Sequence, residues 1–115
     1  MLAPIETRFA EIIWSHAPLS SGELVKRSEE ALGWKKSTTY TVLRRLCERG
    51  LFQNDGGTVT VLVTRDEYEN RQSTAFVEEN YGGSLPRFLA AFSAGKKLSP
   101  EEADALQALI DQSRR

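Results

Sequence analysis

One short stretch carries the side chains best suited to contact a nucleic acid. It runs from Gly33 to Gly50 and places amines, hydroxyls, an aromatic ring and guanidinium groups at helical spacing, about 100° per residue. Groups of these kinds bond to base edges and phosphates in a major groove. The candidate DNA-binding residues on its polar face and N-terminal approach are Lys35, Lys36, Ser37, Thr38, Tyr40, Thr41, Arg44 and Arg45. We expect Tyr40, Thr41 and Arg44 to contact bases, and the others to lie nearer the backbone.

The opposite face of this stretch has to pack against a core. Thr39, Val42, Leu43 and Leu46 recur there at helical spacing. Gly50 follows the last of them, where a left-handed residue commonly ends a helix. A basic amphipathic helix also fits an ordinary solvated surface helix, so the flanking elements decide between the two readings.

Two shorter helices are expected before this stretch. Residues 6–16 place apolar side chains at helical spacing, and Ser20 with Glu23 forms a capping box that starts a second helix. Gly33 ends that second helix, and Trp34 then stands where a large ring can wedge both neighbouring helices against the core. Helix, cap, helix, short turn and basic helix is the organisation of a helix-turn-helix.

The pattern changes from helical to extended after Gly50. Residues 51–54 and 59–63 are β-prone runs, and residues 55–58 between them include two glycines that suit a tight hairpin turn. A helix-turn-helix followed at once by a β-hairpin is a winged helix. The turn holds no lysine or arginine, so we expect it to contact phosphates through backbone N–H groups and Thr58.

Three further helices are expected after the wing. One starts at a capping box at Thr64 and runs to about Tyr81, one is capped by Ser84, and the last starts at Ser99 with Pro100 in its first turn. The fold class is therefore mainly α with a small β-hairpin. We expect residues 1–63 to form a winged-helix DNA-binding domain and residues 64–115 a helical dimerisation region.

The apolar stripes of these last helices exceed what a small wing can cover. We therefore expect two copies of the chain to interleave as a homodimer. The alternative is a monomer in which the same helices complete the core. The expected dimer contacts are Phe76, Val77, Tyr81, Phe88, Leu89, Phe92, Leu106 and Ile110.

Composition restricts the remaining possibilities. The net charge is −1, but residues 26–49 hold seven Lys or Arg against three Glu, a net +4, whereas residues 66–111 hold four against nine Asp or Glu, a net −5. His16 and Cys47, the single histidine and cysteine, cannot build a metal site, and we expect both to pack at the core or its boundary. No catalytic constellation, metal or cofactor is expected, and with no spanning run or signal peptide the cytoplasm is favoured.

Several features of the chain recur together in one known family: Trp34, the pattern Thr38-x-x-Thr41-x-Leu43-x-Arg45-Leu46-x-x-x-Gly50, the short wing, Asp66-Glu67-Tyr68, Gly82-Gly83-Ser84 and Leu98-Ser99-Pro100-Glu101-Glu102. On these features the chain, from Glu6 to about Asp111, resembles the penicillinase-repressor family of bacterial winged-helix regulators. It implies a homodimeric repressor that places its third helix in the major groove of palindromic operators. Thr38 and Thr41 match the hydroxyl positions of the recognition helix, and Arg45 matches its arginine.

The resemblance also implies a mode of release and an upstream partner. Family members are often released from operators when a membrane sensor triggers cleavage in the C-terminal helices, usually at an Asn-Phe bond. The corresponding bond here is Ala91-Phe92, which departs from that pattern. The paired cysteines of copper-responsive relatives are absent from the C-terminal sequence.

A second function class stays open from the residues alone. A sequence pI near 5.9 and a wing turn without cations also suit a winged helix that binds protein and not DNA. Nothing in the sequence favours an enzyme.

Overall fold

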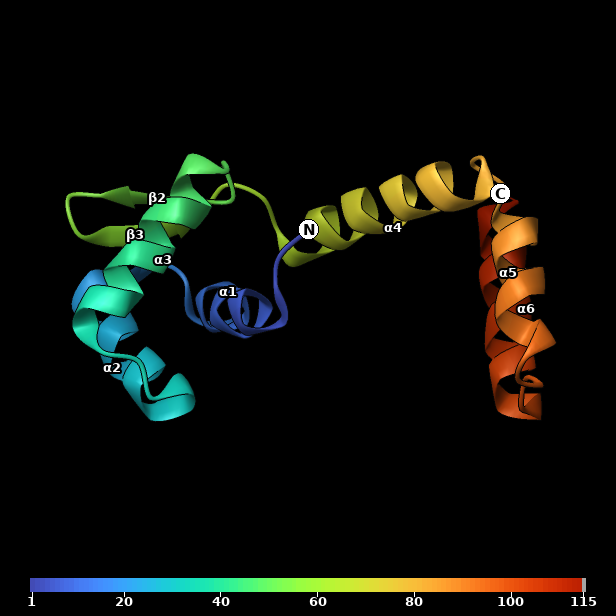
Figure 1. Cartoon of the computed structure of the whole chain (residues 1–115), viewed down its shortest axis with the longest axis horizontal. Coiled ribbons are helices and arrows are strands. Elements are labelled where there is room, and N and C mark those ends of the chain that lie inside the picture. The colour runs from blue at the N-terminus through green and yellow to red at the C-terminus, as the bar shows by residue number, and fades with distance from the viewer. Residues whose placement is uncertain (115) are drawn as a thin grey trace. The chain divides into compact units, whose positions relative to one another are not determined.

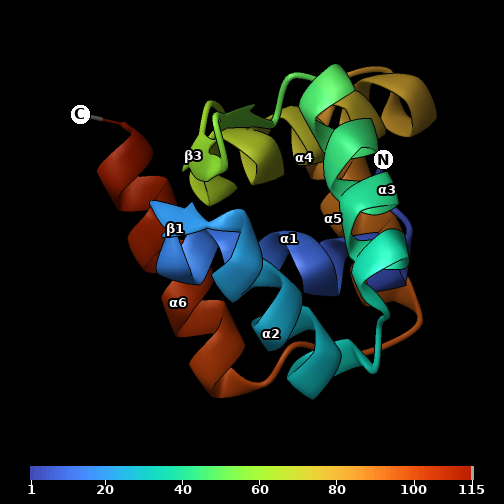
Figure 2. The ribbon, with the colours of Figure 1, turned by 90° about the vertical axis from the view of Figure 1, so that its left-hand side faces the viewer.

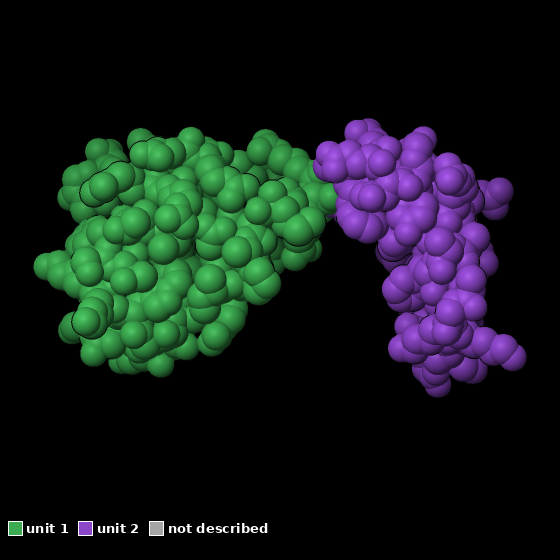
Figure 3. All heavy atoms as spheres, viewed as in Figure 1, with its two compact units in different colours: residues 1–72 green, residues 73–115 purple. Residues whose placement is uncertain are grey.

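The computed structural model describes residues 1–114, which form six helices and three short strands. In chain order these are α1 (Pro4–His16), β1 (Leu19–Ser20), α2 (Ser21–Leu32), α3 (Lys36–Glu48), β2 (Phe52–Asp55), β3 (Thr58–Val61), α4 (Arg65–Tyr81), α5 (Leu85–Ala94) and α6 (Pro100–Ser113) (Figure 1). The chain divides into two compact units, residues 1–72 and the part from Ser73 onward (Figure 3). The predicted mainly α fold, with a winged helix followed by C-terminal helices, is confirmed.

The first unit is built around one apolar core to which α1, α2, α3 and the wing all contribute. Phe9 and Ile13 of α1 are fully buried, as are Leu24 of α2 and Phe52 and Val59 of the hairpin. Figure 2 shows α2 and α3 in front of α1. The buried residues of α3 are the four predicted from its spacing, so the opposite face is turned to solvent.

The sheet contains one strand that the sequence analysis missed. β1 pairs antiparallel with β3, giving the order β1-β3-β2 with Leu19 opposite Val59 and Ser20 opposite Thr58. A two-residue strand is too short to show any alternating pattern, so no periodicity could reveal it. Its effect is to hold the start of α2 against the wing.

Helix ends agree with the predicted caps, with one correction. Ser20 Oγ accepts a bond from the Glu23 N–H at 3.0 Å, and Gly33 ends α2 in the left-handed region at φ 69°. The return half of the predicted capping box is replaced, because the Glu23 carboxylate accepts a bond from Arg27 at 3.1 Å. Arg27 also contacts His16, which is exposed, so the expectation that His16 packs at the core or its boundary is wrong.

The first turns of α4 belong to the first unit. Tyr68 is buried, and its hydroxyl accepts a bond from the Leu2 N–H at 2.9 Å. Arg65 forms an ion pair with Glu11 of α1, and the Trp14 ring lies 5.6 Å from that of Tyr68. These contacts belong to the first unit, whose last residue, Gln72, lies within α4.

The second unit is held together by aromatic and aliphatic side chains. The ring of Phe88 in α5 lies 6.0 Å from Phe76 and 5.4 Å from Tyr81, both on α4, and 6.1 Å from Phe92. Of the residues the structure describes, none in α5 or α6 is buried. The second unit therefore leaves much of its apolar surface in contact with solvent.

Glu6 links the start of α1 to α3. One carboxylate oxygen accepts a bond from the Ala3 N–H at 2.9 Å, and the other accepts a bond from Arg45 at 3.2 Å. The Ala3 N–H bond, and after it the Arg45 guanidinium, outweigh the opposing effect of burial and hold the pKa of Glu6 below its ordinary value. The folded state therefore favours the ionised carboxylate.

Removal of the buried Phe9 ring should make the first unit less stable. We expect Phe9→Ala to lower the free energy of unfolding by about 3–5 kcal/mol, because it removes a fully buried ring and leaves a cavity. Ile5→Ala on the same helix, where the side chain is 41% exposed, should cost less than about 1 kcal/mol. Urea unfolding followed by circular dichroism measures both, and equal losses would contradict the assigned core.

The lowered pKa of Glu6 makes a pH-dependent prediction. Its stabilising contribution is complete above the pKa of the unfolded chain and is lost as the pH falls through the folded-state pKa. We expect Glu6→Gln to lower the urea midpoint at neutral pH, and the difference from the parent chain to vanish well below the ordinary glutamate pKa of about 4.3. Glu29→Gln, exposed on α2, controls for the loss of a carboxylate. A Glu6→Gln difference that persists unchanged into acid would contradict the proposed linkage.

Candidate nucleic-acid interface

The polar face of α3 is the one continuous surface on which most of the predicted DNA-binding residues meet. The α3 side chains that are exposed are Lys36, Ser37, Thr38, Thr41, Arg44, Arg45 and, at the C-terminal end, the acidic Glu48, and Lys35 is exposed directly before the helix. Tyr40 is half-buried. Figure 2 shows α3 on the near side of the winged helix, with no other part of the first unit in front of it. The apolar face of the same helix fixes this orientation.

The N-terminus of α3 is suited to an anion. Lys35 occupies the N-cap position, and no side chain caps the helix. The backbone N–H groups of the first turn therefore lack a capping partner, and the helix dipole adds partial positive charge at the same end. Lys36, Ser37 and Thr38 surround this end with one amine and two hydroxyls, which is the donor set that phosphate oxygens accept from.

The two arginines of α3 have different surroundings. Arg44 is exposed and forms no hydrogen bond or ion pair with any described residue. Arg45 is 55% exposed at its side chain and is bonded to Glu6. Arg44 is thus free to fork onto a base edge, whereas Arg45 is held at the flank of the helix by α1.

Tyr40, which the sequence predicts to contact bases, has partners for both its hydroxyl and its ring within the protein. Its hydroxyl donates to Ser21 Oγ at 3.2 Å, at the start of α2. The Lys36 ammonium lies 6.0 Å from the centre of its ring. The ring is therefore packed between α2 and α3, and its hydroxyl already has a partner within the protein.

The wing turn is closed by bonds of its own. Gly56 and Gly57 have φ values of 60° and 92°, as the predicted tight turn requires. The Gly57 N–H donates to Asn54 Oδ1 at 3.1 Å, and the Gly57 carbonyl accepts from the Ser21 N–H at 2.8 Å. The Gly57 amide, one of those expected to face phosphate, therefore already donates to a partner within the protein. The side chain of Thr58 is exposed.

A cleft of about 260 Å³ separates α3 from β2. It is lined by Tyr40, Leu43, Arg44, Cys47 and Asn54. Cys47 is half-buried, and burial raises the pKa of its thiol, with a smaller opposing effect from the Asn54 N–H. The thiol is accordingly protonated at neutral pH, and boundary packing of Cys47 agrees with the sequence-based expectation.

Other kinds of site find little support in the described part of the chain. Within residues 1–114 no three His, Cys, Asp or Glu side chains gather closely enough to hold a metal ion. None of the helices described there has both the length and the apolar character needed to cross a bilayer.

The predicted dimer contacts lie in the second unit with their apolar groups partly uncovered. Phe92 is 55% exposed, Ile110 48% and Phe76 42%, and the other predicted contacts are half-buried. A groove of about 360 Å³ between α5 and α6 is lined almost entirely by apolar side chains, among them Leu89, Phe92 and Leu106. Their role in dimerisation stays a prediction.

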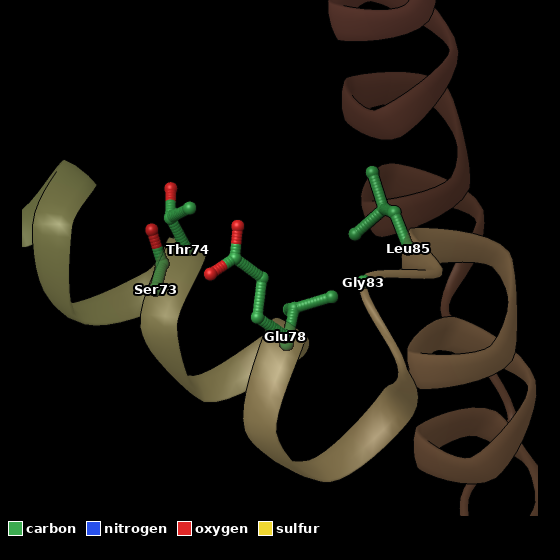
Figure 4. A pocket seen from close by; sticks show the side chains of 6 residues that line it. Ser73, Thr74, Glu78, Gly83 and Leu85 are labelled. Carbon is green, nitrogen blue, oxygen red and sulfur yellow. The ribbon is translucent and has the colours of Figure 1, made fainter.

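A second pocket in this unit, of about 310 Å³, lies where α4 meets α5. Figure 4 shows Ser73, Thr74 and Glu78 along α4, with Leu85 at the start of α5. Its lining mixes polar and apolar groups, and Val77 belongs to it. The Ala91-Phe92 bond, which departs from the Asn-Phe bond usually cleaved in the family, lies inside α5.

Sequence reasoning missed two residues that hold the interface in place. Glu6 fixes Arg45 across 39 positions of the chain, and Ser21 accepts the Tyr40 hydroxyl across 19. Neither pair has a local spacing signal, because helical periodicity reports only neighbours three or four residues apart. Ser21 carries no charge, so the distribution of charged residues could not have identified it either.

Comparison with known proteins agrees with the geometry. A family model described as penicillinase repressor matches residues 2–112. The chain is also 25% identical over 115 residues to the penicillinase repressor of Bacillus licheniformis, in an alignment that covers 96% of this chain and 90% of that relative. The match extends through both compact units, and the chain belongs to the penicillinase repressor family of transcriptional regulators.

Proposed function

We propose that the chain is a transcriptional repressor that binds specific duplex DNA as a homodimer. The observation that carries the proposal is the exposed polar face of α3, whose opposite face is buried in the core. The family match supports a repressor, and the name of the Bacillus licheniformis relative agrees with it. DNA as partner implies that the protein works in the cytoplasm, and no catalytic role is proposed.

Each part of the interface has a distinct task in this proposal. Thr41 and Arg44 read base edges in the major groove, with Arg44 well suited to a guanine. Lys35, Lys36, Ser37 and Thr38 bind phosphates at the start of α3, and Arg45 binds a phosphate at its flank. Thr58 of the wing contacts the adjacent backbone. Tyr40 holds α3 against the start of α2, because its hydroxyl is bonded to Ser21.

The partly exposed apolar surface of the second unit supports homodimerisation. Two copies that cover Phe88, Leu89 and Phe92 on α5, and Leu106 and Ile110 on α6, would remove these side chains from water. A two-fold dimer presents two recognition helices, so the expected target is a palindrome with half-sites one or more helical turns apart. Release by an upstream sensor protease, which the family resemblance implies, is not part of the proposal, because Ala91-Phe92 stands where the family has its Asn-Phe bond.

A winged helix that binds a protein partner is the competing function. The absence of lysine and arginine from the wing turn, residues 55–58, favours it. Under this alternative Arg44 and Arg45 would be dispensable for binding the protein partner, and the dimer would retain no duplex at moderate salt.

DNA selection followed by substitution tests the main proposal. Purified protein is incubated with fragmented genomic DNA of its source, and retained fragments are sequenced. We expect enrichment of a short inverted repeat. On a duplex carrying that repeat, Arg44→Ala should weaken the binding free energy by about 1–3 kcal/mol, because it removes a base contact. It should also relax the preference for one base at one position of each half-site.

Lys36→Ala is the matched comparison on the same helix. It should weaken binding to the repeat and to random duplex alike, and should reduce the slope of log affinity against log salt by about one, because it removes a phosphate contact. Equal losses on repeat and random duplex for both variants would contradict the role given to Arg44. No enrichment at low salt would favour the protein-binding alternative.

Charge placed on the second unit tests the dimer. We expect Phe92→Glu to convert a dimer to a monomer, because a carboxylate would be buried without a partner in the interface. Ala90→Glu adds the same charge on the opposite side of α5, where it is exposed, and should leave the dimer intact. Sedimentation equilibrium measures the mass. A parent chain that sediments with the mass of one chain would overturn the homodimer.

A further inference from the structure

Ser21 is bonded to both elements that the proposed function places on DNA. Its side-chain oxygen accepts the hydroxyl of Tyr40 on α3 at 3.2 Å. Its backbone N–H donates to the Gly57 carbonyl in the wing turn at 2.8 Å. It stands at the first position of α2, directly after the N-cap Ser20, so its own backbone is fixed by the helix start. One residue thus joins three elements that are distant in sequence.

The two bonds are placed where they set the spacing of the interface. Tyr40 lies one helical turn before Arg44, so a bond at its hydroxyl fixes the part of α3 that presents the proposed base contacts. Gly57 is the residue before Thr58, so a bond at its carbonyl fixes the proposed wing contact. The Ser21 hydroxyl also lies 3.7 Å from where a Cβ on Gly57 would stand, which confirms how closely the turn and α2 approach.

We propose that Ser21 is a positioning residue that sets the distance between the recognition helix and the wing. The inference rests on the proposed DNA binding and extends it to a residue with no assigned contact. Two elements that contact different parts of a duplex bind tightly only when their separation matches the duplex. A residue that fixes that separation in the free protein removes an ordering cost from binding.

Three substitutions distinguish the effect of the side-chain bond from that of the backbone bond. Ser21→Ala and Tyr40→Phe each remove the side-chain bond, one from either end. Ser21→Pro removes that bond and also the N–H that binds Gly57, and it places a ring carbon where that N–H points, so the Gly57 carbonyl has to move away. Proline is well tolerated at the first position of a helix, and Ser20 already has the extended conformation, φ −72° and ψ 152°, that precedes proline. The start of α2 should therefore survive all three changes.

Binding is measured on the duplex retained by the parent chain, with hydroxyl-radical footprints of each complex. We expect Ser21→Ala and Tyr40→Phe each to raise Kd about three- to tenfold, and the double variant to lose no more than either single one, because all three lack the same bond. Ser21→Pro should lose more and should also lose the footprint of the wing, while the major-groove footprint of α3 remains.

Controls separate positioning from general damage. Ser113→Ala removes an exposed hydroxyl from the second compact unit and should leave Kd and footprint unchanged. Thermal unfolding of Ser21→Ala and of Tyr40→Phe should stay close to that of the parent chain, whereas Ser21→Pro, which displaces the wing turn, is judged by its footprint. A loss of binding in Ser21→Ala or Tyr40→Phe that parallels a loss of stability would overturn the proposal, since it would make Ser21 a stabilising residue only.

Further outcomes overturn the inference without touching the proposed function. They are an unchanged Kd in Ser21→Ala, a complete wing footprint in Ser21→Pro, the absence of any wing footprint in the parent complex, or additive losses in the double variant. A loss in Tyr40→Phe that far exceeds Ser21→Ala and alters preference at one base would instead assign Tyr40 to base reading. If the parent chain retains no duplex, it is the proposed function that fails.

Discussion

The two-faced character of α3 is the constraint on which the rest of the structure depends. Thr39, Val42, Leu43 and Leu46 must leave water, and they do so against α1, α2 and the hairpin. A helix anchored along one side has no freedom to turn, so the hydroxyl and guanidinium groups of its other side are held outward. The surface that the proposed function uses is therefore a by-product of core packing, and a change in the core would displace it.

Polar bonds then refine a position that apolar packing has chosen. Glu6 fixes Arg45 at one flank of α3, and Ser21 fixes Tyr40 at another. Each bond contributes little free energy by itself, because it replaces a bond to water. Their value is directional: packed side chains tolerate small sliding movements, whereas a hydrogen bond holds two named atoms at one distance.

The sequence predicted most of the architecture, and the reasons for its failures are physical. The core face of α3, the hairpin turn and the helix starts at Thr64, Ser84 and Ser99 depend on neighbours a few residues apart, so periodicity and capping patterns revealed them. β1 is too short to have a period. The Glu23 carboxylate accepts a bond from Arg27, one turn away, in place of the N-cap backbone N–H, and the capping pattern takes no account of such a competing donor. The partners of Arg45 and Tyr40 depend on tertiary packing, which no local pattern contains.

The single thiol of the chain gives the interface a built-in place for a reporter group. Cys47 lines the cleft between α3 and β2, beside Arg44, and no other cysteine competes with it for a label. Because burial raises the pKa of the thiol, a fluorophore should attach to it more slowly than to an exposed cysteine at the same pH. A dye carried there would sense any large partner that approaches the recognition helix, whether nucleic acid or protein, with no cysteine introduced by mutation.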